Sequence, residues 1–82
     1  MEQLETTTTE YLSFTRNQRP GAKTYMIDVQ TKDKSTYLGV IKWWSHWRRY
    51  VFTPSKDTLF DAACLTDITS YINKLMLDRK TS

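Results

Sequence analysis

Cysteine, histidine and glycine are scarce in this chain, and each scarcity excludes a class of site. The 82 residues include one cysteine, one histidine, two glycines and two prolines. A single cysteine, Cys64, excludes an intramolecular disulfide and is typical of a reducing compartment. Two glycines are too few for a glycine-rich phosphate-binding loop. A lone histidine, His46, lacks the companions that a zinc site needs.

Long apolar runs are also missing. No run approaches the roughly 20 residues that span a bilayer. The acidic, threonine-rich start of the chain is unlike a secretory signal peptide. We therefore expect a cytoplasmic protein with no membrane segment.

The same scarcity argues against catalysis. Catalysis usually needs a base that a second group orients inside a pocket, and a short chain with one histidine offers few candidates. Cys64 falls on an apolar stripe and is predicted to be a small buried hydrophobe rather than a nucleophile. We predict that the protein is not an enzyme and has no catalytic residue, no metal ligand and no small-molecule cofactor.

The periodicity of the chain predicts one small domain. Residues 1–9 show no apolar periodicity and are predicted to be a flexible tail, which leaves a single domain over residues 10–80. Apolar and polar side chains alternate with the period of a β-strand in residues 10–16, 23–31, 36–44 and 47–53.

Near Asp61 the period changes to 3.6, which predicts a helix over about residues 62–79. Asp61 or Thr66 is the candidate N-cap of this helix. The predicted fold is α+β, a four-stranded antiparallel β-meander with one C-terminal α-helix packed on one face.

Aromatic and basic side chains are concentrated in residues 42–50, which hold all three tryptophans and two adjacent arginines. Residues 34–56 include five lysines and arginines but no aspartate or glutamate. Flat side chains interleaved with cations suit the stacking of bases and the neutralisation of phosphates. The predicted binding residues are Tyr37, Lys42, Trp43, Trp47, Arg48, Arg49, Tyr50, Phe52 and Lys56.

The register of the hairpins decides which of these residues share a face. Loops of two or four residues would fix the parity of the pairing. The predicted pairs are Val29 with Leu38, Ile27 with Val40 and Val40 with Val51, with the helix on this aliphatic face. The other face would then be free and would carry Tyr37, Ile41, Trp43, Arg48, Tyr50 and Phe52. The same register pairs Trp43 with Arg48 and Lys42 with Arg49. A loop of odd length would exchange the faces, and the site would move to Lys42, Trp44, Trp47 and Arg49.

Four short motifs carry a resemblance to known sequences: Gly39-Val40-Ile41-Lys42-Trp43, Trp47-Arg48-Arg49-Tyr50-Val51-Phe52-Thr53-Pro54, Phe60-Asp61 and Cys64-Leu65-Thr66-Asp67-Ile68. The pattern resembles a family of small uncharacterised proteins that phages and mobile elements carry, and it covers about a third of the chain. The resemblance implies a phage or bacterial origin, where small non-enzymatic proteins often bind DNA or block a host protein. It transfers no activity and no functional residue.

Taken together, these features predict a small non-catalytic binding protein. The first prediction is nucleic-acid binding through an aromatic and basic sheet face. Tryptophan, tyrosine and arginine also dominate the hot spots of protein interfaces. The alternative is therefore a protein-interaction module, such as a phage-type inhibitor of a host protein, or a homodimer formed through the same face. The sequence leaves open whether the partner is DNA, RNA or protein.

Overall fold

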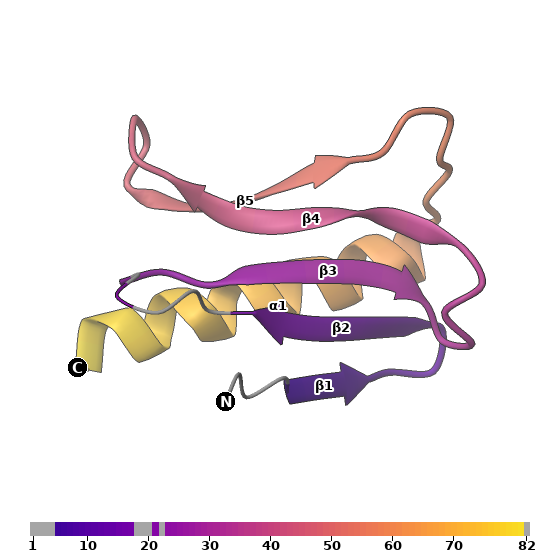
Figure 1. The fold of residues 1–82 in the computed structure, drawn as a ribbon, viewed down its shortest axis with the longest axis horizontal. Helices are drawn as coiled ribbons and strands as arrows, with labels where there is room; N and C mark the ends of the chain where they lie inside the picture. The colour runs from indigo at the N-terminus through magenta and orange to yellow at the C-terminus, as the bar shows by residue number, and fades with distance from the viewer. Residues whose placement is uncertain (1–4, 18–20, 22, 82) are drawn as a thin grey trace.

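A computed structural model describes residues 5–17, 21 and 23–81, and in this part of the chain five strands and one helix form the fold (Figure 1). The strands make one antiparallel sheet in the order β1-β2-β3-β4-β5. The prediction of an α+β fold with an antiparallel sheet and a C-terminal helix is confirmed, but the predicted number of strands is wrong. The elements are β1 (Glu5–Thr8), β2 (Leu12–Asn17), β3 (Met26–Thr31), β4 (Tyr37–Trp44), β5 (Arg49–Pro54) and α1 (Ala62–Thr81).

The additional strand, β1, lies in the segment that was predicted to be a flexible tail. It pairs with β2, with Thr6 opposite Thr15 and Thr7 opposite Phe14. Threonine is β-branched and favours extended backbone. The side chains of Thr6, Thr7 and Thr8 are exposed, so this edge strand has no apolar alternation by which the sequence could reveal it. The rest of the predicted tail, residues 1–4, lies outside the described residues.

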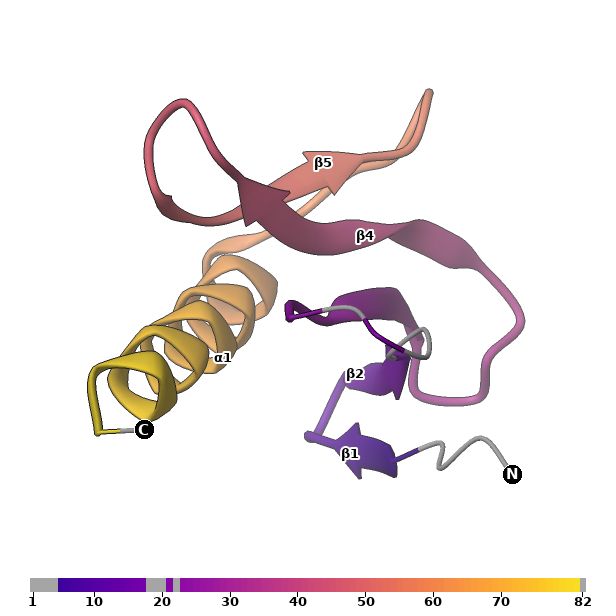
Figure 2. The same cartoon turned by 60° about the vertical axis from the view of Figure 1, so that its left-hand side comes forward.

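Helix α1 covers one face of the twisted sheet and reaches from β2 to β5 (Figures 1 and 2). The ring of Tyr71 stacks on Phe14 of β2 at a centroid distance of 4.7 Å. At the opposite edge of the sheet, the backbone N–H of Tyr50 in β5 donates to Sδ of Met76 at 3.5 Å. The buried core between these contacts consists of Leu12, Phe14, Ile27, Val29, Leu38, Ile41, Tyr50, Ile68, Tyr71 and Leu75.

Asp61, one of the two predicted candidates, is the N-cap of α1. Its Oδ1 accepts the N–H of Cys64 at 2.9 Å, and its carbonyl oxygen accepts the N–H of Leu65 at 3.0 Å. The bond from the backbone of Cys64 holds the pKa of Asp61 below its ordinary value. Thr66 is inside the helix instead, where its hydroxyl donates to the carbonyl of Ala62 at 2.8 Å. Such bonding back to the preceding turn is common for threonine in a helix.

A β-bulge interrupts the pairing of β3 with β4. Gln30 lies opposite Tyr37, but the preceding residue of β3, Val29, lies opposite Gly39. Leu38 is therefore an extra residue in β4, and the register changes by one at this point.

The bulge exchanges the faces of β4 beyond it, because neighbouring residues of a strand point to opposite faces. Ile27 lies opposite Ile41, and Asp28 lies opposite Val40. The predicted pairing of Val29 with Leu38 is wrong, and so is the prediction that Val40 shares the helix-covered face with Ile27. Ile41 occupies that place and is fully buried.

Gly39 is the residue that makes the bulge possible, and its replacement should destabilise the fold. Its φ is +154°, and a Cβ at this position would meet the carbonyl oxygen of Thr53 and would lie 2.8 Å from the ring of Phe52. We expect Gly39→Ala to lower the free energy of unfolding by about 2–4 kcal/mol through backbone strain and overpacking. Urea denaturation measures this change.

Gly21→Ala is the matched control for that substitution. Gly21 also has a positive φ, +81°, but an added Cβ would have no neighbour within 4 Å. Only backbone strain remains, so the expected cost is about 1 kcal/mol. Equal destabilisation by the two substitutions would contradict the close approach of Phe52 and Thr53 to Gly39.

The turn between β3 and β4 is organised by one carboxylate. Asp33 Oδ1 accepts the backbone N–H of Ser35 at 3.0 Å, the hydroxyl of Thr31 at 2.7 Å and the hydroxyl of Ser35 at 2.7 Å. These bonds, with the backbone bond from Ser35 the largest cause, lower the pKa of Asp33 from 3.8 to about 2. The ionised form is therefore favoured in the folded state.

The lowered pKa of Asp33 predicts a pH-dependent contribution to stability. A group with a depressed pKa in the folded state stabilises above its unfolded pKa, and this stabilisation is lost as the pH falls through the folded value. The stabilisation that Asp33 contributes is therefore lost between pH 3.8 and about pH 2. We expect wild type to be more stable than Asp33→Asn at pH 5, and the difference in melting temperature to shrink toward pH 2. A difference in melting temperature that is constant across this pH range would contradict the lowered pKa of Asp33.

Candidate aromatic and basic binding surface

The β4–β5 hairpin positions most of the aromatic and basic residues of the chain. The connecting loop is residues 45–48, and residues that lie opposite each other on the two strands share a face of the sheet. Trp43 lies opposite Tyr50 and Lys42 lies opposite Val51. Because the loop has four residues rather than two, these pairs replace the predicted pairs of Trp43 with Arg48 and of Lys42 with Arg49, which are wrong.

One side of this hairpin supports the core. Trp43 is half-buried and meets the ring of Tyr50 edge-on at 5.3 Å. Tyr50 is only 3% exposed, and its hydroxyl accepts the backbone N–H of Tyr25 at 3.2 Å. Phe52 meets Phe60 edge-on at 5.3 Å. The prediction that Trp43, Tyr50 and Phe52 lie on the free face is wrong, because the bulge at Leu38 turns them toward the helix.

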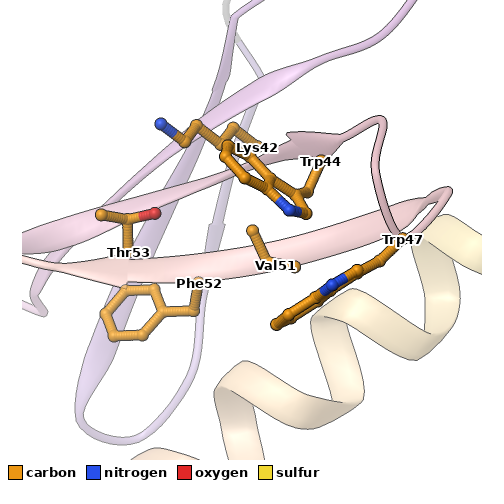
Figure 3. Close-up of a pocket in the computed structure, with 6 residues that line it drawn as sticks. All are labelled: Lys42, Trp44, Trp47, Val51, Phe52 and Thr53. Atoms are coloured by element: carbon orange, nitrogen blue, oxygen red, sulfur yellow. The ribbon is translucent and has the colours of Figure 1, made fainter.

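The opposite side of the hairpin carries a pocket of about 420 Å³ (Figure 3). Lys42, Trp44 and Thr53 alternate with the core-facing residues, and in Figure 3 the side chain of Val51 appears between the indole rings of Trp44 and Trp47. Phe52 reaches the pocket from the other side of β5. The lining residues are Lys42, Trp44, Trp47, Val51, Phe52 and Thr53.

Backbone hydrogen bonds hold the loop that carries Trp47. The N–H of Trp47 donates to the carbonyl of Trp44 at 3.2 Å, and the N–H of Arg48 donates to the carbonyl of Ser45 at 3.3 Å. Arg48 has a left-handed conformation with φ of 51°, which reverses the chain into β5. Nε of Arg49 donates to the carbonyl of Trp47 at 3.3 Å. The loop therefore has a defined shape, although its side chains are exposed.

The two tryptophans at the pocket are both exposed. Trp44 is 39% exposed and Trp47 is 65% exposed. The ring of His46 lies 5.2 Å from that of Trp44 at a tilt of 31°. We call Lys42, Trp44, Trp47 and Arg49 the tryptophan surface. It is the set that the sequence assigns to the site when the faces are exchanged.

Two of the predicted binding residues lie apart from this surface. Tyr37 starts β4, at the opposite end of the strand from Trp44, and its hydroxyl donates to Asp28 Oδ1 at 3.4 Å. Partial burial and the neighbouring Asp28 carboxylate raise the pKa of Tyr37. Lys56 is exposed in the turn after β5 and does not line the pocket.

The binding residues predicted from the first register did not include three residues of the pocket, Trp44, Val51 and Thr53. All three follow from strand alternation once the bulge is known, and Trp44 was named in the alternative register. Of the nine predicted residues, Lys42, Trp47 and Phe52 line the pocket. Arg48 and Arg49 flank it, since they are in or next to the loop that carries Trp47.

Two other kinds of feature, a metal-ligand cluster and a membrane-spanning helix, are absent from the described residues. Nowhere in residues 5–17, 21 and 23–81 do three His, Cys, Asp or Glu side chains come together as they would to hold a metal ion. In the same part of the chain, no helix has both the length and the apolar character that crossing a membrane requires. The tryptophan surface is therefore our candidate functional site.

The fold and this surface define a small α+β protein with an exposed aromatic and basic patch. The chain is 48% identical over 77 residues to a protein of Acholeplasma phage L2 named "Uncharacterized 9.3 kDa protein". The match covers 94% of this chain and 99% of the phage protein, so the chain belongs to the family of this small phage protein. The resemblance predicted from the sequence is thereby confirmed. No protein-family model and no solved structure matches the chain.

Adjacent tryptophans should respond in opposite ways to truncation. Trp43 packs against the core, so we expect Trp43→Ala to lower the free energy of unfolding by about 2–4 kcal/mol. Trp44 lies outside the core, and Trp44→Ala should cost less than about 1 kcal/mol. Urea denaturation of the two variants provides the comparison. A larger loss for Trp44→Ala would show that the faces of β4 are assigned the wrong way round.

Proposed function

We propose that the protein is a non-catalytic nucleic-acid-binding protein and that the tryptophan surface is its binding site. The observation that supports the proposal most strongly is the pairing of two exposed indole rings with a lysine around one pocket. Trp44 and Trp47 line the pocket together with Lys42. Aromatic rings supply stacking surface for bases, and cations beside them neutralise backbone phosphates.

The charge around the pocket suits an anionic ligand. No aspartate or glutamate occurs in residues 34–56, and the chain carries a net charge of +3. Arg48 and Arg49 are exposed next to the pocket, and Lys42 is half-buried at its lining. Lysine can place its aliphatic stem on apolar neighbours and keep its ammonium group in water. Three cations are thus available for phosphate contacts.

The exposure of the tryptophans also supports a binding role. In a chain of 82 residues the core is small, and large aromatic side chains are its most effective source of buried area. The fold buries Tyr50 and packs Trp43 against the core, yet it leaves Trp44 and Trp47 accessible. Exposed apolar patches bordered by polar groups generally mark an interaction site.

The setting that we propose is the cytoplasm of an infected or lysogenic bacterial cell. The relative at 48% identity is a phage protein, and the chain has a single cysteine, as is typical of proteins in a reducing compartment. DNA and RNA are both present there, and both carry the phosphates and bases that the surface suits.

A protein partner, either a host protein or a second copy of the chain, is the alternative. Trp47 and Arg49 are of the residue types that dominate protein hot spots, and both are exposed. A pull-down from nuclease-treated bacterial lysate, with light scattering of the purified protein, separates the two proposals. A nuclease-resistant partner or a stable dimer would favour the alternative.

Salt dependence tests the nucleic-acid proposal directly. Three phosphate contacts predict that the logarithm of the affinity falls with the logarithm of the salt concentration with a slope between about −2 and −3. Fluorescence anisotropy with labelled single-stranded and double-stranded oligonucleotides measures this slope. Binding that does not change with salt, or no binding to any of the strands, would refute the proposal.

Lys42→Gln is the variant that locates the site. Removal of one phosphate contact should weaken binding to every sequence and reduce the magnitude of the slope by about 1. Lys74→Gln makes the same chemical change on the exposed side of α1 and should leave the slope unchanged. Equal effects of both variants would mean that net charge, rather than the tryptophan surface, governs binding.

A further inference from the structure

The shape of the pocket narrows the kind of nucleic acid that can use it. Trp44 and Trp47 come from different elements, one from the end of β4 and one from the following loop, yet their rings line one pocket (Figure 3). Its volume of about 420 Å³ falls within the range of roughly 300–1,000 Å³ that is typical of small-molecule sites. A pocket of this size accommodates a single small group rather than the width of a double helix.

The walls of the pocket select a ligand with an exposed flat face. In a duplex, each base hides both faces in the stack and presents only its edges in the grooves. Single strands and loops leave bases that can be splayed out and stacked on aromatic side chains. Trp44 and Trp47 can therefore use their ring faces only with an unpaired base.

The polar groups at the pocket exclude a cationic ligand. Aromatic pockets also bind quaternary ammonium groups, which are attracted to the faces of the rings. Here Lys42 is part of the lining, and Arg49 is fixed beside the loop by its 3.3 Å bond to the carbonyl of Trp47. Two cations next to the rings repel a further cation and attract an anion.

We propose that the pocket takes one unpaired base of a single-stranded nucleic acid, held against Trp44 and Trp47, with Lys42 at the adjoining phosphate. This inference rests on the proposed nucleic-acid binding and adds to it a preference for single strands. Stacking is sequence-tolerant, because every base has a flat face. The ligand class is therefore single-stranded DNA or RNA without a required base sequence.

An abasic strand tests the inference, because it keeps the phosphates and lacks the bases whose flat faces would stack on the tryptophans. Fluorescence anisotropy is measured with oligothymidine of about 12 nucleotides, its abasic counterpart, an oligouridine and a duplex. We expect the protein to bind oligothymidine or oligouridine about 5- to 100-fold more tightly than the abasic strand. The two intact strands show whether DNA or RNA is preferred, and preference for either supports the inference.

Trp47→Ala is the variant that connects this preference to the pocket. It should remove most of the advantage of the intact strand and leave the affinity for the abasic strand unchanged. Tyr11→Ala is the matched control, since Tyr11 is 51% exposed and does not line the pocket. This control should keep the full advantage of the intact strand.

The failures of the two proposals are distinguishable. Equal affinity for intact and abasic strands, or tighter binding of the duplex, would overturn the single-base inference even if binding is salt-dependent. A preference for intact strands that Trp47→Ala does not reduce would also overturn it. Failure to bind all four oligonucleotides would overturn the proposed function together with the inference.

Discussion

One extra residue in β4 determines which side chains of the β4–β5 hairpin support the fold and which meet solvent. Leu38 is inserted where β4 begins to pair with β3, and the register beyond it is displaced by one. Because side chains alternate between the faces of a strand, this displacement turns Ile41 and Trp43 toward the helix and Lys42 and Trp44 away from it. Paired residues of β4 and β5 share a face, so Tyr50 also points toward the helix and Val51 away from it. The core and the tryptophan surface are thus two results of a single bulge.

The bulge in turn depends on a residue without a side chain. Gly39 adopts a positive φ, and the ring of Phe52 lies 2.8 Å from the place where a Cβ would be. Phe52 then packs edge-on against Phe60, which leads into the helix. Of the two glycines in the chain, one therefore allows β4 and β5 to approach closely at the bulge and keeps the connection to α1 packed.

Properties that are local to a segment were predictable from the sequence, whereas those set by pairing between segments were not. The period of apolar residues predicted β3, β4 and α1 with small errors at their ends, and the side chain of Asp61 marked the start of α1. The strand β1 was missed, because an edge strand with exposed side chains is held by hydrogen bonds and shows no apolar alternation.

The bulge was missed for a related reason. A glycine in a run of strand-forming residues shows that the strand is weak at this point, but not which neighbouring residue will lack a partner. The predicted register was correct next to the turn, where Gln30 lies opposite Tyr37. It failed at the neighbouring pair, where Val29 lies opposite Gly39 rather than Leu38. This error moved Trp43, Tyr50 and Phe52 from the proposed surface to the core side. The tryptophan surface corresponds to the alternative register, so the sequence limited the site to two candidate sets without choosing between them.

The two cations of the tryptophan surface differ in how closely their charge is tied to the shape of the site. Arg49 donates to the carbonyl of Trp47, so its guanidinium group both adds positive charge and holds the loop that presents the indole ring. Its replacement would alter charge and ring position together, and a loss of binding could not be assigned to either. Lys42 lies within β4, opposite Val51, where the sheet fixes the backbone independently of the side chain. Its charge can be removed while the strand stays in register, and for this reason Lys42 reports on phosphate contact alone.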